Sequence, residues 1–166
     1  KLHLQSTGLL QGQMALAGAE ITNSGYFFDG KQGDGMQVLL SKQADTPQAQ
    51  RSTWVQDGNG RIHLASQPNL CITPSGSLFN LAACQSQGTG QSLLYYNNMQ
   101  NPWVLQRQGT GWCMDFNRSA INVSSYNCTA NANQKWNGVV RNEEPWLQVL
   151  SADSLKEVGR LLLQTP

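Results

Sequence analysis

Short runs of alternating apolar and polar residues, separated by turns rich in Gly, Ser and Pro, fill most of the chain. Between positions 59 and 100 the runs are GRIHLAS, NLCITP, SLFNLAAC and SLLYYN. Between positions 101 and 140 they are PWVLQRQ, GWCMDF, INVSSYNC and QKWNGVV. Runs this short that are rich in β-branched and aromatic residues predict strands, so the expected fold class is all-β.

The chain repeats itself with a period of about 42 residues. Cys71 and Cys113 are 42 residues apart, and Gln91 and Gln134 are 43 residues apart. Self-similarity at this period is typical of architectures built from repeated supersecondary units. The three copies are expected at residues 19–58, 59–100 and 101–140.

Three copies of four strands can close into one barrel-like domain over residues 1–166 without leaving long bare edges. One copy alone would bury too little surface to be stable, so we expect three copies around a pseudo-threefold axis to share one core. The core residues expected to recur in the copies are Trp54, Leu93 and Trp136. Residues 1–18 and 141–166 lie outside the copies. Their segments KLHLQ and GRLLLQ are expected to pair as closing strands, with a helix over ADSLKEVGRLLL as the alternative.

Four cysteines form two local pairs in the sequence, Cys71 with Cys84 and Cys113 with Cys128. An even number of cysteines in local pairs favours these two disulfides among three possible connectivities. Loops of this size stabilise a fold by about 3 kcal/mol each in the chain-entropy model. Disulfides imply an oxidising compartment or the extracellular medium, so a secreted protein is expected. Buried thiols in a cytosolic domain are the alternative. The spacings and the two histidines give no zinc pattern, so no metal is expected.

Composition narrows the range of partners. The net charge is +1 and only 13% of residues are charged, so there is no basic stripe for nucleic acid or an anionic membrane. No run of 18 apolar residues is present, and a transmembrane segment is therefore not expected. The opening KLHLQSTGLLQGQ lacks both an initiator Met and the compact apolar run of a signal peptide, which favours a mature chain or a segment of a longer one.

The stretch GWCMDFNRSAINVSSYNCTANANQKW, residues 111–136, has a distinctive order. Cys-x-Asp is followed by a strand that ends in aromatic-x-Cys, and then by Asn-Gln-x-Trp. This order resembles the repeat of the ricin B-type (R-type) lectins, which are β-trefoils. The match is closest over residues 101–140, partial over 59–100 and faint over 19–58.

The resemblance implies a β-trefoil and a carbohydrate-binding module, commonly for galactose or N-acetylgalactosamine on cell-surface glycoproteins or glycolipids. Such modules belong to toxins or secreted hydrolases, and a pore-forming bacterial haemolysin is one parent that would fit. The chain would then be part of a larger, oligomeric toxin that the module attaches to cells.

The third copy supplies the groups that a sugar site needs. Asp115 would accept hydrogen bonds from two adjacent sugar hydroxyls, and Asn133 would donate to one of them. Tyr126 would cover the apolar C–H patch of the ring. Ser124 stands where the family often has a longer polar side chain, and Gln134 is expected to brace the site. Taken singly, these residues also fit ordinary roles in loops, strands and turns; their joint order favours a binding site.

The other two copies lack this set. In the second copy, Thr73, Ala82 and Gly90 stand at the carboxylate, aromatic and amide positions. In the first copy only Asp29 remains, and a turn residue is the simpler interpretation of it. We therefore predict one working site in the chain.

An enzyme and a protein-binding module are the competing classes. The two histidines lie in no nucleophile motif such as Gly-x-Ser-x-Gly, and Asp115 has no second carboxylate nearby for paired acid–base hydrolysis. We therefore expect neither catalysis nor a cofactor. A protein-binding β-trefoil, such as a protease inhibitor or a receptor ligand, stays open as the alternative, since it would use exposed loops and would need no Asp–Tyr–Asn set.

Overall fold

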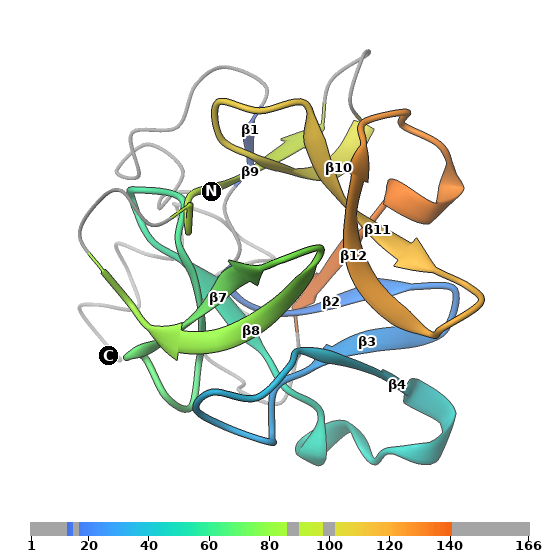
Figure 1. The fold of residues 1–166 in the computed structure, drawn as a ribbon. Helices are drawn as coiled ribbons and strands as arrows, with labels where there is room; N and C mark the ends of the chain where they lie inside the picture. The colour runs from blue at the N-terminus through green and yellow to red at the C-terminus, as the bar shows by residue number, and fades with distance from the viewer. Residues whose placement is uncertain (1–12, 15–16, 86–89, 98–101, 141–166) are drawn as a thin grey trace, which may run out of the picture.

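A computed structural model describes residues 13–14, 17–85, 90–97 and 102–140 (Figure 1). The strands are β1 (Gln13–Met14), β2 (Ala17–Asn23), β3 (Tyr26–Asp29), β4 (Leu39–Lys42), β5 (Trp54–Gln56), β6 (Ile62–Leu64), β7 (Leu70–Ser75), β8 (Leu78–Ala83), β9 (Leu93–Asn97), β10 (Pro102–Arg107), β11 (Trp112–Asn117), β12 (Asn122–Asn127) and β13 (Asn137–Val140). Three short 3₁₀ turns are η1 (Gln43–Asp45), η2 (Gln48–Gln50) and η3 (Ala132–Gln134). Within these residues no helix is long and apolar enough to cross a membrane. The segments KLHLQ and GRLLLQ lie outside the described residues.

Strands β2 to β13 fall into three consecutive sets of four, β2–β5, β6–β9 and β10–β13. The two middle strands of each set form an antiparallel hairpin: β3–β4, β7–β8 and β11–β12. Figure 1 shows these hairpins arranged around the centre of the molecule. The all-β prediction is confirmed. The predicted N-terminal extension, residues 1–18, contains β1, which pairs with β9, and the start of β2 at Ala17.

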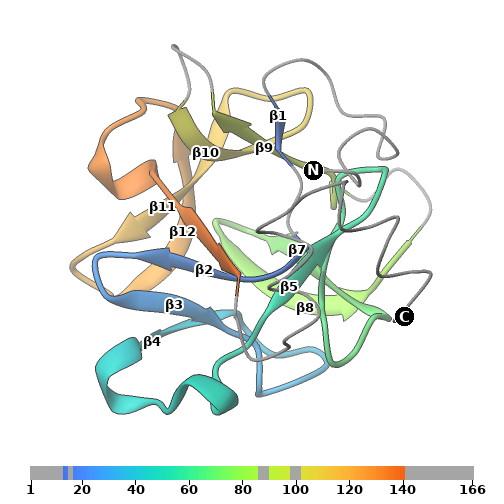
Figure 2. The ribbon, with the colours of Figure 1, turned by 180° about the vertical axis from the view of Figure 1, so that it is seen from behind.

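Hydrogen bonds between the hairpins join the three sets. Strand β12 pairs with β4, and Ser125 N donates to Ser77 O at 2.8 Å, in the turn between β7 and β8. The chain just before β4 pairs with β8, with Val38 N donating to Phe79 O at 2.8 Å. On the opposite side β2 pairs with β3, β5 and β13, and Figure 2 shows β2 beside β5. Hydrogen bonds thus join each copy to the other two.

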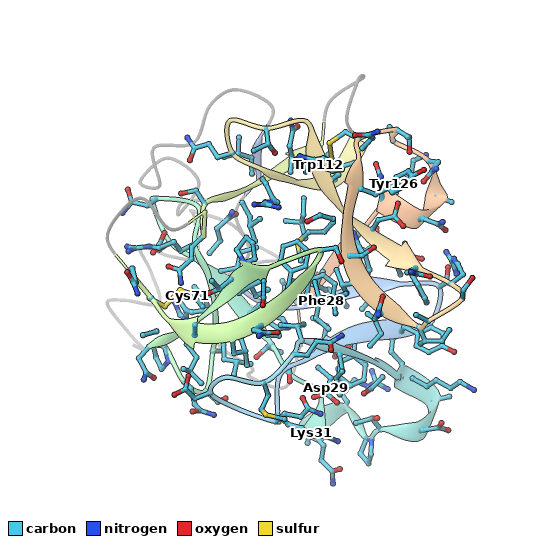
Figure 3. The ribbon with its side chains drawn as sticks, in the orientation of Figure 1. Phe28, Asp29, Lys31, Cys71, Trp112 and Tyr126 are labelled. Atoms are coloured by element: carbon cyan, nitrogen blue, oxygen red, sulfur yellow. A yellow bond between two sulfur atoms is a disulfide. The ribbon has the colours of Figure 1, made fainter. Side chains whose placement is uncertain are left out.

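The core lies where the three copies meet. Trp54, Leu93 and Trp136, the residues expected to recur, are all fully buried. Phe28 lies at the centre in Figure 3, with its ring centroid 4.7 Å from that of Trp136 and 6.3 Å from that of Trp54, both edge-to-face. Such aromatic pairs add about 0.5–1.5 kcal/mol beyond the burial of their area.

Two of these core side chains also fix neighbouring backbone. Trp136 Nε1 donates to Met114 O at 2.9 Å, and Trp54 Nε1 donates to Phe28 O at 3.3 Å. In both copies the accepting carbonyl belongs to the residue just before the acidic residue of the hairpin. The core tryptophan therefore positions the strand that carries the acid.

Both disulfides have the pairing that the spacing favoured. Cys71 bonds Cys84 with an S–S distance of 2.06 Å, and Cys113 bonds Cys128 at 2.05 Å. Each bridge joins the first strand of its hairpin to the residue that follows the second strand. Two disulfides indicate folding in an oxidising compartment rather than in the cytosol.

Gly30 lies against core side chains, so a substitution there shows how tightly the core is packed. A Cβ atom there would lie 2.8 Å from Trp54 Cη2 and 2.9 Å from Leu64 Cδ2, so Gly30→Ala should force core side chains apart. We expect this change to lower the free energy of unfolding by about 1–3 kcal/mol in denaturant titrations. Gly111→Ala is the matched control, because no atom beyond the adjacent residues lies within 4 Å of its added Cβ, and it should stay within about 0.5 kcal/mol of the wild type. Equal stability of the two variants would contradict this description of the core.

Candidate functional site

The register of β11 against β12 brings predicted site residues to one face. Asp115 is directly opposite Ser124, and Tyr126 is opposite Cys113. Because side chains alternate between the two faces of a strand, these groups share the outer face of the hairpin. Met114, Phe116 and Val123, which occupy alternate positions on the same strands, are buried in the core.

An open hollow of about 410 Å³ lies over this face and η3. Four of the five predicted site residues line it: Asp115, Ser124, Tyr126 and Asn133. The other lining residues are Phe116, Asn117, Arg118, Ser119 and Asn131. The structure therefore brings together residues up to 18 positions apart in the sequence, whereas Gln134 lies beneath the hollow and does not line it.

Gln134 is fully buried and makes hydrogen bonds through both ends of its carboxamide. Its Nε2 donates to Asp115 Oδ2 at 3.0 Å and to Asn127 O at 2.8 Å. Its Oε1 accepts from Thr129 N at 2.8 Å and from Ala130 N at 3.2 Å. One side chain thus ties the acid of β11 to the end of β12 and to the turn that leads into η3.

The carboxylate of Asp115 keeps one oxygen available. Oδ2 is held by Gln134, while no described residue donates to Oδ1. The residue is only 8% exposed, and this burial raises the pKa of its carboxyl above the ordinary value of 3.8. The hydrogen bond from Gln134 and the positive charge of Arg118 lower that pKa by less than burial raises it. Oδ1 is therefore an acceptor with no partner among the described residues, on a side chain that lines the hollow.

The amide of Asn133 is oriented by its neighbours. Its Oδ1 accepts from Arg118 Nε at 2.8 Å, and its backbone N donates to Asn131 Oδ1 at 3.1 Å. No described residue accepts from its Nδ2, so the two N–H groups of that nitrogen are left for a ligand on the lining of the hollow.

Aromatic rings near the site differ in exposure. Tyr126 is 56% exposed and stands at the edge of the molecule on β12 (Figure 3). Trp112 is 43% exposed at the start of β11, whereas Phe116 is 1% exposed and stacks on Trp136 at 6.3 Å. Tyr126 is thus the ring of the hollow that offers a face to a ligand.

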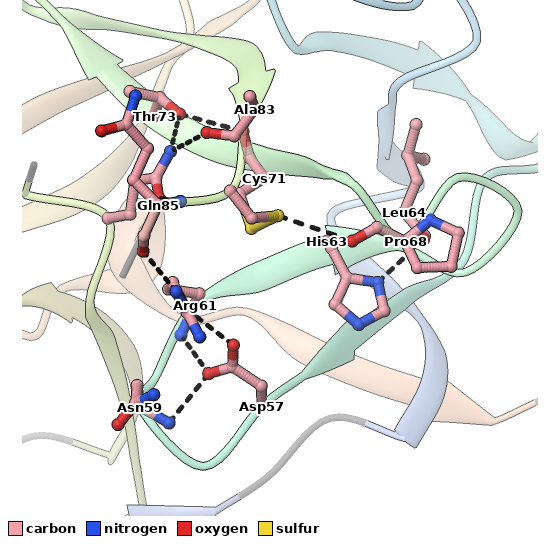
Figure 4. The surroundings of a disulfide bond; sticks show 12 residues. Asp57, Asn59, Arg61, His63, Leu64, Pro68, Cys71, Thr73, Ala83 and Gln85 are labelled. Atoms are coloured by element: carbon pink, nitrogen blue, oxygen red, sulfur yellow. Dashed lines mark hydrogen bonds and ion pairs between the residues drawn. A yellow bond between two sulfur atoms is a disulfide. The ribbon is translucent and has the colours of Figure 1, made fainter. Parts of the chain in front are cut away.

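In the second copy, Gln91 makes the hydrogen bonds that Gln134 makes in the third, but the carboxylate and the aromatic ring are missing. Gln91 Nε2 donates to Thr73 Oγ1 at 2.8 Å and to Ala83 O at 3.0 Å, and its Oε1 accepts from Gln85 N at 2.9 Å. These are the same three kinds of contact that Gln134 makes, and Figure 4 shows the partner residues Thr73, Ala83 and Gln85 beside the disulfide of Cys71. The register places Ala82 opposite Cys71, where the third copy has its tyrosine. The hairpin persists there with neither a carboxylate nor a ring.

The first copy uses its acid internally. Asp29 is 1% exposed, its Oδ1 accepts from Lys31 N at 3.0 Å, and its Oδ2 accepts from Ser41 Oγ at 2.7 Å. Lys31 Nζ also lies 3.7 Å from Oδ2. The backbone contact is the one expected of a turn residue. Ser41 lies opposite Phe27, at the position that corresponds to the tyrosine of the third copy. Its hydroxyl donates to Asp29, so this position offers no aromatic ring and its hydroxyl proton is already used.

Arg118 is the main lining residue that the sequence analysis missed. It lies in the turn between β11 and β12, which Asn117 Oδ1 caps by accepting from Ser119 N at 3.0 Å and from Ala120 N at 3.2 Å. One signal was available, because Asp115 and Arg118 are the only charged residues between positions 111 and 134. Among the described residues, no three His, Cys, Asp or Glu side chains gather in a way that could hold a metal ion.

Comparison with known proteins supports the fold. No family model and no curated protein sequence matches the chain. Among solved structures it is similar to GalNAc-T7 crystallised with UDP, GalNAc and Mn²⁺, with a TM-score of 0.59 and 19% identity over 74% of this chain and 22% of that one. It is also similar to the agglutinin from Abrus precatorius, with a TM-score of 0.56 and 18% identity over 75% of this chain and 47% of that one.

The chain therefore corresponds to about a fifth of the first neighbour and to just under half of the second. These likenesses confirm the predicted fold, an all-β trefoil of the kind found in ricin B-type lectins. At this level of identity the likeness concerns the fold, and the site has to be judged from its own residues.

The raised pKa of Asp115 predicts a pH dependence of stability. Because the ionised carboxyl costs more free energy in the folded than in the unfolded chain, its protonation favours the folded state. The free energy of unfolding of the wild type should therefore increase relative to Asp115→Asn as the pH falls from 7 through the folded-state pKa to below 3.8. Denaturant titrations of both proteins over this range measure the difference. A difference that stays flat, or that changes in the opposite direction, would contradict the assigned environment.

Proposed function

We propose that this chain is a carbohydrate-binding module with one site, the hollow in its third copy. The observation that carries the proposal is the free Oδ1 of Asp115, held beside an exposed tyrosine ring and an oriented amide. The equivalent acid of the first copy has both oxygens occupied, and the second copy has no acid.

The geometry suits one face of a galactose-type ring. Asp115 Oδ1 accepts from two adjacent hydroxyls through charge-assisted bonds, which are about twice as strong as neutral ones. Asn133 Nδ2 donates to the oxygen of one of these hydroxyls, and Ser124 adds a hydroxyl on the opposite strand. Tyr126 covers the apolar C–H patch. The ligand in this proposal is galactose or N-acetylgalactosamine at the end of a cell-surface glycan.

The structural neighbours are in keeping with such a ligand. One of them is an agglutinin, and the other was crystallised with GalNAc. Binding also fits the hollow better than glycoside hydrolysis does, since Asp115 is the one carboxylate among the described residues that line it. Hydrolysis by paired carboxyl groups needs a second acid about 5–9.5 Å away.

A single shallow site implies weak binding, with a dissociation constant on the order of 1 mM, or about −4 kcal/mol. Firm attachment to a cell would then require several of these modules acting together in one assembly, because linking the sites raises the effective concentration at which each one meets its glycan. We infer that the module serves a larger, secreted and oligomeric protein, of which a toxin is the kind that fits best.

Titration calorimetry with galactose, N-acetylgalactosamine and lactose tests the proposal. We expect the wild type to bind at least one of these sugars and Asp115→Asn to lose at least tenfold in affinity, because a charge-assisted acceptor is worth about 1.5–3 kcal/mol. The binding of the wild type should also weaken as the pH falls through the raised pKa of the carboxyl, since only the ionised form accepts from two hydroxyls.

Thr73→Val is the matched control for this titration. It changes the residue at the position of the second copy that corresponds to Asp115, where there is no ring to complete a site, and sugar binding should stay within twofold of the wild type. An absence of heat from every sugar in a folded wild-type protein would refute the proposal and would favour the protein-binding alternative.

A further inference from the structure

Arg118 is held in one place by contacts to residues of the first and the third copy. Its Nε donates to Asn133 Oδ1 at 2.8 Å, and its Nη2 donates to Asn23 Oδ1 and to Ser24 Oγ, each at 3.1 Å. Its guanidinium carbon also lies 4.2 Å from the centre of the Phe116 ring. Asn23 in turn donates to the backbone carbonyls of Ala132 and Lys135 at 2.9 and 3.0 Å. The guanidinium is therefore ordered before any ligand binds.

This arrangement leaves part of the guanidinium unused. Three of its five N–H groups are accounted for by the contacts of Nε and Nη2, and no described residue accepts from Nη1. Arg118 lines the hollow, and among the described lining residues it is the only one with a positive charge. It is close enough to Asp115 for its charge to lower the pKa of that carboxyl.

We propose that Arg118 makes the site selective for an acidic glycan, in which the sugar gripped by Asp115 carries, or is linked to, an anionic group that binds Nη1. This inference rests on the proposed function, because it assigns the kind of sugar that the same hollow prefers. The anion is a sulfate ester or the carboxylate of an attached acidic sugar, since both present oxygens that a guanidinium binds through charge-assisted hydrogen bonds.

The opposite charges of Asp115 and Arg118 suit them to different parts of the ligand. The carboxylate of Asp115 accepts from hydroxyls and repels an anion, so the acidic substituent must lie on the side of Arg118. The guanidinium carries no acceptor and therefore cannot replace Asp115 for a hydroxyl proton. Because the arginine side chain is already fixed by four contacts, little conformational entropy is lost when it binds, which favours selectivity at a shallow site.

The test compares charged and neutral ligands of the same core. Affinities are measured by calorimetry for lactose, for lactose sulfated at the 3′ or 6′ position, and for lactose sialylated at either position. In the wild type we expect at least one acidic ligand to bind about tenfold more tightly than lactose, with a preference that falls as salt is raised. The sulfated and sialylated arms show which anion is preferred.

The ratio of acidic to neutral affinity is the readout in the variants, because Arg118 also positions Asn133 and its loss can change both affinities. Arg118→Gln should bring the ratio to about one, and Arg118→Lys should retain part of it. Lys135→Gln is the matched control, since it removes the same charge from an exposed residue nearby that does not line the hollow, and it should keep the preference.

Lactose that binds as well as every acidic ligand, or a preference that survives in Arg118→Gln, would overturn the inference while leaving the proposed function in place; Arg118 would then be only a clamp between the copies. Failure of all the ligands to bind the folded wild type would refute the proposed function and this inference together.

Discussion

The buried carboxamide of Gln134 is the contact on which the candidate site depends. It holds Asp115 of β11, the carbonyl that ends β12 and two backbone amides of the turn before η3. Without it, the buried carboxylate of Asp115 would lose its hydrogen-bond donor, at a cost of about 1–3 kcal/mol, and the three partly buried backbone groups would lose a partner as well. The same side chain leaves only one oxygen of the acid engaged. A contact that stabilises the fold therefore also prepares the acceptor for a ligand.

Comparison of the three copies separates the scaffold from the site. Gln91 makes in the second copy the contacts that Gln134 makes in the third, and both hairpins are bridged by a disulfide. What differs is the outer face, where Thr73 replaces the acid and an alanine replaces the ring. The first copy keeps an acid but consumes both of its oxygens within the hairpin. The hairpin thus forms with or without the carboxylate and the ring on its outer face, which is why the fold alone does not assign a function.

Much of this arrangement could be predicted from the sequence, because it follows from local rules. Alternation with period two places Asp115 and Tyr126 on one face of a hairpin, and the spacing of Cys113 and Cys128 favours their bridge. The part that could not be predicted depends on contacts between copies. Arg118 reaches Asn23, 95 residues earlier, and no pattern within the third copy indicates that contact. Nor does the sequence show that Asp115 Oδ1 is free while both oxygens of Asp29 are occupied, since this depends on side-chain positions in the folded hairpins.

The hollow over β11, β12 and η3 is the proposed place where the sugar binds. An NMR titration of the ¹⁵N-labelled chain with methyl β-galactoside measures this directly, residue by residue. We expect shifts of backbone and side-chain amides around Asp115, Ser124, Tyr126 and Asn133, and none around Thr73 of the second copy. Shifts centred on the second or first hairpin, or no shifts at millimolar sugar, would contradict the claim.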